Sequence, residues 1–148
     1  MILKGKSSGE RAEAGTEEKF SRTVLELARH PKNMGKVEDA DGFATVTGPC
    51  GDTMSMWLKV EEGVIVGAGF TTDGCTSSIA SASMATMMAK GRRIDEAPRV
   101  RPEEILDALG GLPEENRHCA LLAVNTLAAS VRDCRERRRK RDGMETAG

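Results

Sequence analysis

Four cysteines are the residues of this chain best suited to chemistry, and three of them stand where secondary-structure elements are expected to begin or end. Cys50 lies in a Gly-Pro-Cys-Gly-Asp loop, where Pro and Gly hold the backbone and keep the thiol accessible. Cys75 follows Asp-Gly at the expected start of a helix, and Cys119 follows His118 at the start of another. A helix N-terminus presents unpaired N–H groups and a positive dipole end, both of which favour a thiolate. These positions predict metal binding or nucleophilic chemistry.

The fourth cysteine, Cys134, has a different setting. At helical spacing it falls on one stripe with Val124, Leu127 and Val131. Cysteine in such a stripe behaves as a small buried hydrophobic residue, so Cys134 is predicted to be structural. His30 is also predicted to be no ligand, because it lies at an expected helix end where a cation suits the dipole and no cysteine stands near it.

The spacing of the three thiols at element ends limits the kind of site they can form. No Cys-x-x-Cys pair occurs, which argues against zinc ribbons, RING-like sites and thioredoxin-type motifs. Asp52 lies two residues after Cys50, and His118 is adjacent to Cys119. Thiolates, imidazole and carboxylate all bind Zn²⁺, and iron–sulfur clusters are held mainly by thiolates. On spacing alone, unrelated thiols explain the pattern as well as one shared pocket does.

Composition restricts the class of protein. The chain has 148 residues, 30% of them charged and 39% apolar, which is typical of one soluble globular domain. A net charge of −1 gives no global attraction to nucleic acid or to an anionic membrane. No apolar run approaches the roughly 18 residues of a membrane helix, and the N-terminus lacks a signal-peptide apolar region. We therefore expect a cytoplasmic protein with no nucleic-acid or membrane partner, whose reduced cysteines bind metal or act in catalysis.

The elements that must position the thiols are indicated by periodicity. Apolar side chains recur at helical spacing over residues 17–29, with Thr16 as the expected N-cap. Three segments rich in β-formers or in alternating apolar residues are predicted as strands, over residues 43–48, 53–61 and 64–72. Helices are predicted over residues 76–90 and 101–109 and from Pro113 onward. The order predicts an α+β fold, a small antiparallel three-stranded sheet preceded by one helix and followed by a helical C-terminal half.

The chain is expected to divide into three parts. Residues 1–16 are rich in Gly, Ser and charge and are predicted as a disordered leader, residues 17–134 as the folded domain, and residues 135–148 as a basic, frayed tail. Residues 135–141 hold six basic residues and one Glu. A solvated helix end is favoured over a nucleic-acid patch there, because no aromatic residues interleave for base stacking.

Four local sequences together resemble the IscU/NifU N-terminal type of iron–sulfur cluster assembly scaffold. Residues 49–52 (Pro-Cys-Gly-Asp) resemble that family's first cysteine loop. Residues 74–83, a Gly-Cys followed by a Ser-Ile-Ala-Ser-rich helix, resemble its second, and residues 118–123 (His-Cys-Ala-Leu-Leu-Ala) its third. Residues 30–35 (His-Pro-Lys-Asn-Met-Gly) resemble its early turn. Because the motifs occur in order and at family-like separations, the resemblance is specific.

The resemblance implies a role for each candidate residue. Cys50, Cys75 and Cys119 would bind an iron–sulfur cluster, most simply a transient 2Fe–2S cluster, and the same pocket would be able to hold Zn²⁺ in the resting protein. Cys119 would be the acceptor of persulfide sulfur from a cysteine desulfurase. Asp52 would be a weak metal ligand that keeps the cluster labile, and His118 an alternative fourth ligand. Weak, exchangeable ligation suits a scaffold, since its product has to leave.

The resemblance also implies partners. The protein would be an assembly scaffold and cluster carrier with no independent enzymatic turnover, working with a cysteine desulfurase, an iron donor or ferredoxin, and apo-protein recipients. Residues 114–116 read Glu-Glu-Asn where many family members have Pro-Val-Lys for a dedicated Hsp70 chaperone, so we expect no such chaperone. Two alternatives stay open: a zinc-bound, SufU-like sulfurtransferase that accepts persulfide, and a structural zinc adaptor.

Overall fold

The computed structural model describes residues 19–147, with side chains up to residue 143. The expected leader, residues 1–16, and Thr16 with it lie outside the described residues. None of the helices in the described part of the chain combines the length and apolar character needed to cross a membrane.

A three-stranded antiparallel sheet of order β1-β2-β3 forms the centre of the fold. Its strands are β1 (Gly42–Thr47), β2 (Thr53–Glu61) and β3 (Val64–Thr72). β2 and β3 have the predicted bounds, and β1 begins and ends one residue earlier than predicted. Apolar residues alternate with more polar ones along β2, and the apolar Met54, Met56 and Leu58 are fully buried on one face, as expected for a strand.

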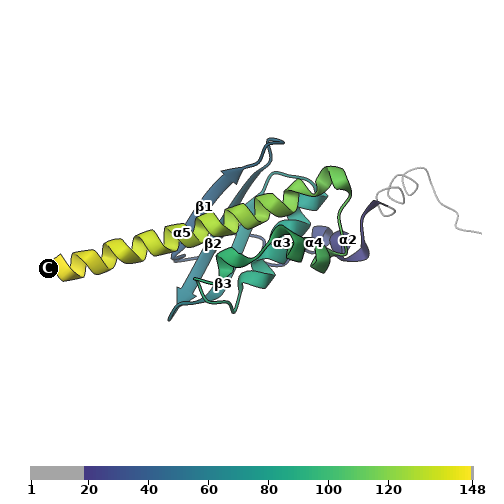
Figure 1. Ribbon diagram of the computed structural model, residues 1–148. Helices are drawn as coiled ribbons and strands as arrows, with labels where there is room; N and C mark the ends of the chain where they lie inside the picture. The colour runs from purple at the N-terminus through teal and green to yellow at the C-terminus, as the bar shows by residue number, and fades with distance from the viewer. Residues whose placement is uncertain (1–18, 148) are drawn as a thin grey trace, which may run out of the picture.

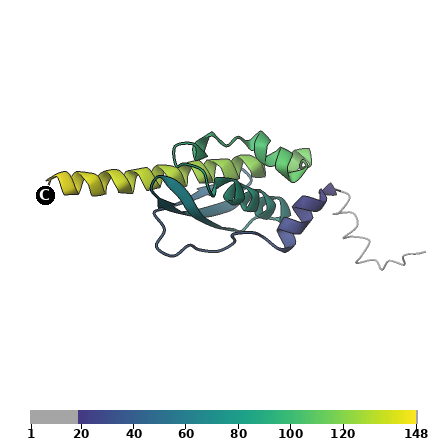
Figure 2. The same cartoon turned by 90° about the horizontal axis from the view of Figure 1, so that it is seen from below.

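Helices cover that buried face. α5 (His118–Ala147) contacts β1 and β2, and α3 (Thr76–Ala89) contacts β3 and α5. Both helices lie along the sheet, with α5 running the length of the molecule (Figures 1 and 2). The Ser130 hydroxyl of α5 donates to the Met56 carbonyl of β2 at 3.0 Å. The predicted α+β architecture is confirmed.

The first described helix is shorter than predicted. α2 (Arg22–Arg29) begins at Arg22, after a bend at Phe20, so the predicted helix does not run unbroken to Arg29; its predicted start lies outside the described residues. The cap is Ser21, whose side chain accepts a hydrogen bond from the Val24 amide at 3.1 Å. The same hydroxyl donates to the carbonyl of Leu109, the last residue of α4 (Pro102–Leu109). This tertiary contact fixes the start of α2. It cannot be predicted from the periodicity of the local sequence.

The C-terminal helix also begins later than predicted. Pro113 is followed by a short 3₁₀ turn, η2 (Glu114–Asn116), and α5 then starts at His118. A further 3₁₀ turn, η1 (Ala97–Arg99), precedes α4. α5 continues as a helix through the basic residues 135–141, where Arg137 pairs with Asp133 at 3.0 Å. The division of the chain at residue 134 stays a prediction.

Candidate functional site

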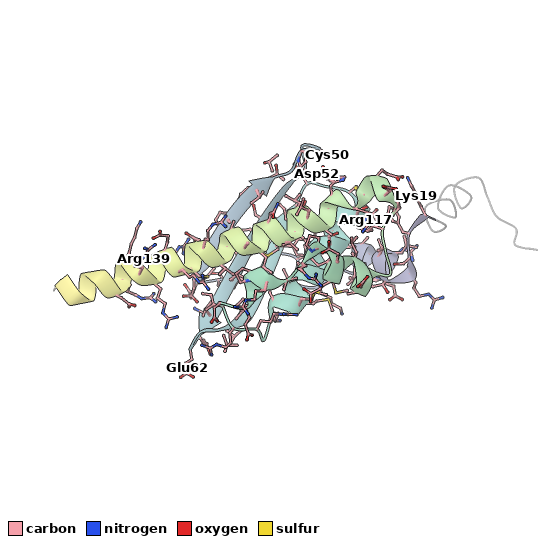
Figure 3. The ribbon with its side chains drawn as sticks, in the orientation of Figure 1. Lys19, Cys50, Asp52, Glu62, Arg117 and Arg139 are labelled. Carbon is pink, nitrogen blue, oxygen red and sulfur yellow. The ribbon has the colours of Figure 1, made fainter. Side chains whose placement is uncertain are left out.

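Three segments meet at one end of the sheet and bring the candidate residues together. They are the loop between β1 and β2, the junction between β3 and α3, and the first turn of α5. Figure 3 labels Cys50 and Asp52 at this end, near the start of α5. The two loops come from adjacent strands, so the antiparallel pairing of the sheet places them side by side.

The β1–β2 loop is a tight turn held by its own backbone. The Gly48 amide donates to the Asp52 carbonyl at 2.8 Å, and the Gly51 amide donates to the Gly48 carbonyl at 3.0 Å. Gly51 has a φ of 91°, in the left-handed region that favours glycine. Cys50 is exposed at the tip of this turn, and Asp52 is half-buried where the chain enters β2.

The β3–α3 junction is tied to the start of β2. The Asp73 carboxylate accepts from the Thr53 amide at 2.7 Å, and the Asp73 amide donates to the Thr53 carbonyl at 3.2 Å. Cys75 is the N-cap residue of α3, but its side chain makes no capping hydrogen bond. Its thiol is exposed and lies beside the first turn of α3, as the sequence predicts.

Three potential ligands converge behind these loops. One ligand atom from each of Asp52, His118 and Cys119 lies within 4.8 Å of the other two. Cys119 Sγ and His118 Nε2 are 3.7 Å apart. A carboxylate, an imidazole and a thiol are a donor set that suits zinc or iron. The structure thus groups three of the five candidates, while Cys50 and Cys75 are exposed and lie outside this group.

Cys119 is almost fully buried, with 1% of its surface exposed. Burial is the main cause that raises the pKa of its thiol, and a hydrogen bond with Ser78 opposes that rise. Negative charge on Cys75, Asp52 and Cys50 raises the pKa further, so all three lie within electrostatic reach of Cys119. The expectation that a helix-start position makes this thiol a ready thiolate is therefore wrong for the metal-free protein. A bound cation reverses this balance, because a coordinating thiol is deprotonated.

Ser78 is the site residue that sequence reasoning missed. Its hydroxyl donates to Asp52 Oδ2 at 3.0 Å and lies 3.5 Å from Cys119 Sγ. Most of the Ser- and Ala-rich run of α3 is buried, and small side chains of this kind are normally explained by close packing. The available signal was its position three residues after Cys75, which places both on the same side of the helix start.

The two residues predicted to be outside the site have other surroundings. Cys134 is 4% exposed and belongs to the hydrophobic core, where burial raises the pKa of its thiol to about 11. His30 follows the last residue of α2 and lines a cavity with Met84 and Met87 of α3. The core position predicted for Cys134 agrees with the structure, and the prediction that His30 is no ligand stays a prediction.

Comparison with known proteins points to one family. Residues 19–141 match the NifU-like N terminal domain. A relative from Archaeoglobus fulgidus, iron-sulfur cluster assembly scaffold protein IscU 1, is 41% identical over 130 residues, covering 87% of this chain and 85% of its own. The iron-sulfur cluster assembly scaffold protein IscU of Azotobacter vinelandii is 39% identical over 124 residues, covering 80% and 96%. A crystal structure of a nitrogen-fixing NifU-like protein (N-terminal) from Brucella abortus superposes with a TM-score of 0.64 at 25% identity, covering 82% of this chain and 97% of that one.

Proposed function

Because this chain belongs to the NifU-like N terminal domain family, we propose that it is a scaffold on which an iron–sulfur cluster is assembled and from which the cluster is passed on. The observation that carries the proposal is the grouping of Asp52, His118 and Cys119 within 4.8 Å at the end of the sheet. Two exposed thiols on adjoining loops, Cys50 and Cys75, complete a set that contains enough thiolates to hold a cluster.

The cluster would be bound from two sides. Cys119 supplies a thiolate from the protein side, and Cys50 and Cys75 supply thiolates from the exposed loops. The fourth position falls to Asp52 or His118, both half-buried beside Cys119. Either is a harder, weaker partner for cluster iron than a thiolate, so the cluster is kept exchangeable. A 2Fe–2S cluster is the smallest that this ligand set fits.

Sulfur would arrive at Cys119 as a persulfide. The Cys119 thiolate attacks the outer sulfur of the persulfide on a cysteine desulfurase, which gives a Cys119 persulfide and releases the thiolate of the desulfurase. Because Cys119 is 1% exposed, this step requires the β1–β2 loop or the start of α5 to move. The raised pKa of Cys119 means that a bound cation, such as incoming iron, helps to form the thiolate.

The remaining parts of the proposal follow from this chemistry. The reduction of persulfide to sulfide needs electrons from a ferredoxin-type donor, iron needs a donor, and apo-proteins are the recipients. We place the protein in the cytoplasm, where its free cysteines stay reduced. In the resting state the Asp/His/Cys group is suited to Zn²⁺. We propose no turnover beyond this assembly and transfer.

Transfer of a cluster to an apo-ferredoxin tests the proposal. Protein reconstituted anaerobically with iron and sulfide is mixed with apo-ferredoxin, and the ferredoxin spectrum is followed after separation of the two proteins. We expect transfer that is faster than from iron and sulfide alone, and slower transfer from Asp52→Ala, because its labile ligand is gone. A colourless zinc protein that only stimulates a desulfurase would instead support the sulfurtransferase alternative.

A further inference from the structure

A buried hydroxyl connects two of the proposed ligands. Ser78 is fully buried in the first turn of α3, with its Oγ 3.0 Å from Asp52 Oδ2 and 3.5 Å from Cys119 Sγ. An ionised carboxylate only accepts hydrogen bonds, so the single hydroxyl hydrogen of Ser78 goes to Asp52. The Cys119 thiol is the third member of this group, with its Sγ 3.5 Å from the same Ser78 oxygen. The three groups form one chain, from thiol to hydroxyl to carboxylate.

The Ser78 hydrogen bond holds the Asp52 carboxylate at Oδ2. An oxygen of the same carboxylate lies within 4.8 Å of a ligand atom of His118 and of Cys119. A carboxylate offers about four lone-pair sites on its two oxygens, so one hydrogen bond leaves sites for a metal. The Ser78 bond therefore fixes the carboxylate beside the other two ligands without using up its capacity to bind a metal.

Gly74 shows that the approach of Ser78 to Asp52 is built into the fold. A Cβ at position 74 would lie 2.6 Å from Ser78 Cβ and 2.8 Å from Asp52 Oδ2, so only glycine fits between them. The two other buried serines near the start of this helix are different. Ser77 and Ser81 are fully buried, and their hydroxyls have no hydrogen-bond partner among the described residues. Ser78 is therefore distinguished from its neighbours by its contacts and not by its burial.

We infer that Ser78 is a positioning residue, whose hydroxyl holds the Asp52 carboxylate in place for a metal beside His118 and Cys119. The inference rests on the proposed function, since it assigns Asp52 as a metal ligand. Hydrogen-bond partners of ligating carboxylates matter for metal binding, and losing one typically weakens metal affinity about 10–100-fold. Ser78 acts only through Asp52 and Cys119, and it is not itself a ligand.

Cobalt(II) binding to the metal-free protein tests this role directly. Cobalt(II) is added under anaerobic conditions, and its visible bands and thiolate charge-transfer band report affinity and coordination. We expect Ser78→Ala to weaken cobalt affinity about tenfold. The matched control, Ser81→Ala, removes a buried hydroxyl one turn further along α3 and is expected to change affinity less than about twofold, since that hydroxyl has no partner to lose.

A double-mutant cycle separates positioning from a general structural effect. If Ser78 acts by holding Asp52, then Ser78→Ala changes cobalt affinity little in the Asp52→Ala background. An equal loss in both backgrounds, or wild-type affinity for Ser78→Ala, overturns the inference. Circular dichroism and thermal unfolding of each variant show that the protein remains folded.

The same samples distinguish this inference from the proposed function. Each variant is also incubated with iron and sulfide, and its visible spectrum is recorded. If the wild-type protein forms no cluster but the cobalt cycle shows coupling between Ser78 and Asp52, the scaffold function fails and the positioning role stands. If the wild type forms a cluster but the cycle shows no coupling, the positioning role alone fails.

Discussion

Gly74 packs against Ser78 so closely that a methyl group does not fit between them. A Cβ at residue 74 would contact the Ser78 hydroxyl and lie 2.8 Å from Asp52 Oδ2. The absence of a side chain at this point lets the β3–α3 junction reach the β1–β2 loop. The lack of a Cβ at Gly74 therefore allows the β3–α3 junction and the β1–β2 loop, two of the three site segments, to come together.

Gly74→Ala is accordingly expected to disturb the site. Forcing a methyl group into such a space typically costs about 1–3 kcal/mol of stability, and here the groups that must shift are Ser78 and Asp52. We expect a lower free energy of unfolding in denaturant, together with weaker metal binding. Gly48→Ala is the matched control in the neighbouring loop, because its Cβ would meet Leu122 at an ordinary 3.5 Å. Equal behaviour of the two variants would contradict this account of the junction.

The buried Cys134 thiol is expected to make the free energy of unfolding fall in alkaline solution. Burial raises the pKa of its thiol from 9.0 to about 11 in the folded protein. Below pH 9 the thiol is protonated in both states, so its contribution to stability is complete. As the pH rises from 9 toward 11, the unfolded state loses this proton first and is favoured.

The expected loss at pH 10 is about 1 kcal/mol of unfolding free energy from this group. Denaturant unfolding of wild type and Cys134→Ala at pH 7.5 and pH 10 measures it. The alanine variant starts less stable but should lose less on going to pH 10. The chain contains no Tyr, so no phenol titration overlaps in this range. An identical pH dependence of the two proteins would show that Cys134 titrates normally.

Much of the fold could be predicted from periodicity, because the burial pattern of a strand is written in its own local sequence. In β2, buried Met54, Met56 and Leu58 alternate with more exposed residues, so the pattern gave the strand and its bounds. The start of α2 was missed because Ser21 is fixed by the distant Leu109 carbonyl. The 3₁₀ turn at η2 was missed because Pro113 is an equally good first residue for a longer helix.

The structure groups three of the five residues that the sequence indicated as candidate ligands, and the sequence did not predict the electrostatics around them. Asp52, His118 and Cys119 were recognised by residue type and by adjacency to loop cysteines, and the structure groups them. The burial of Cys119 depends on how α5 seats on the sheet and on α3, which sequence spacing does not contain. Ser78 was missed because a serine in a small-residue helix is normally explained by packing.

The segment before His118 bears on whether an Hsp70-type chaperone can bind the protein. Glu114 and Glu115 lie in the 3₁₀ turn η2, and Glu115 pairs with Lys19 at 3.0 Å. A hydrogen bond to the backbone and the neighbouring Lys19 lower the pKa of Glu115. Hsp70-type grooves bind extended segments through apolar side chains, and charge decides partner choice. Two carboxylates in a turn suit such a groove poorly.

We expect no acceleration of cluster release by a dedicated Hsp70 and its J-protein partner. Calorimetry with a peptide of residues 110–117 checks this against a control peptide that carries Pro-Val-Lys in place of residues 114–116. Binding should be measurable for the control peptide and absent for the native one. Micromolar binding of the native peptide, or ATP-dependent release of the cluster from the intact protein, would contradict the prediction.

The central claim is that Cys50, Cys75 and Cys119 hold an iron–sulfur cluster, and one spectrum tests it most directly. Wild type and four single Cys→Ala variants are reconstituted anaerobically with iron and sulfide, desalted, and measured for visible absorption, iron and sulfide. The account predicts a red-brown protein for wild type and for Cys134→Ala, whose thiol lies in the core, and loss of the stable chromophore in the other three variants. A wild type that stays colourless, or a folded Cys134→Ala that loses the chromophore while Cys119→Ala keeps it, would contradict the account.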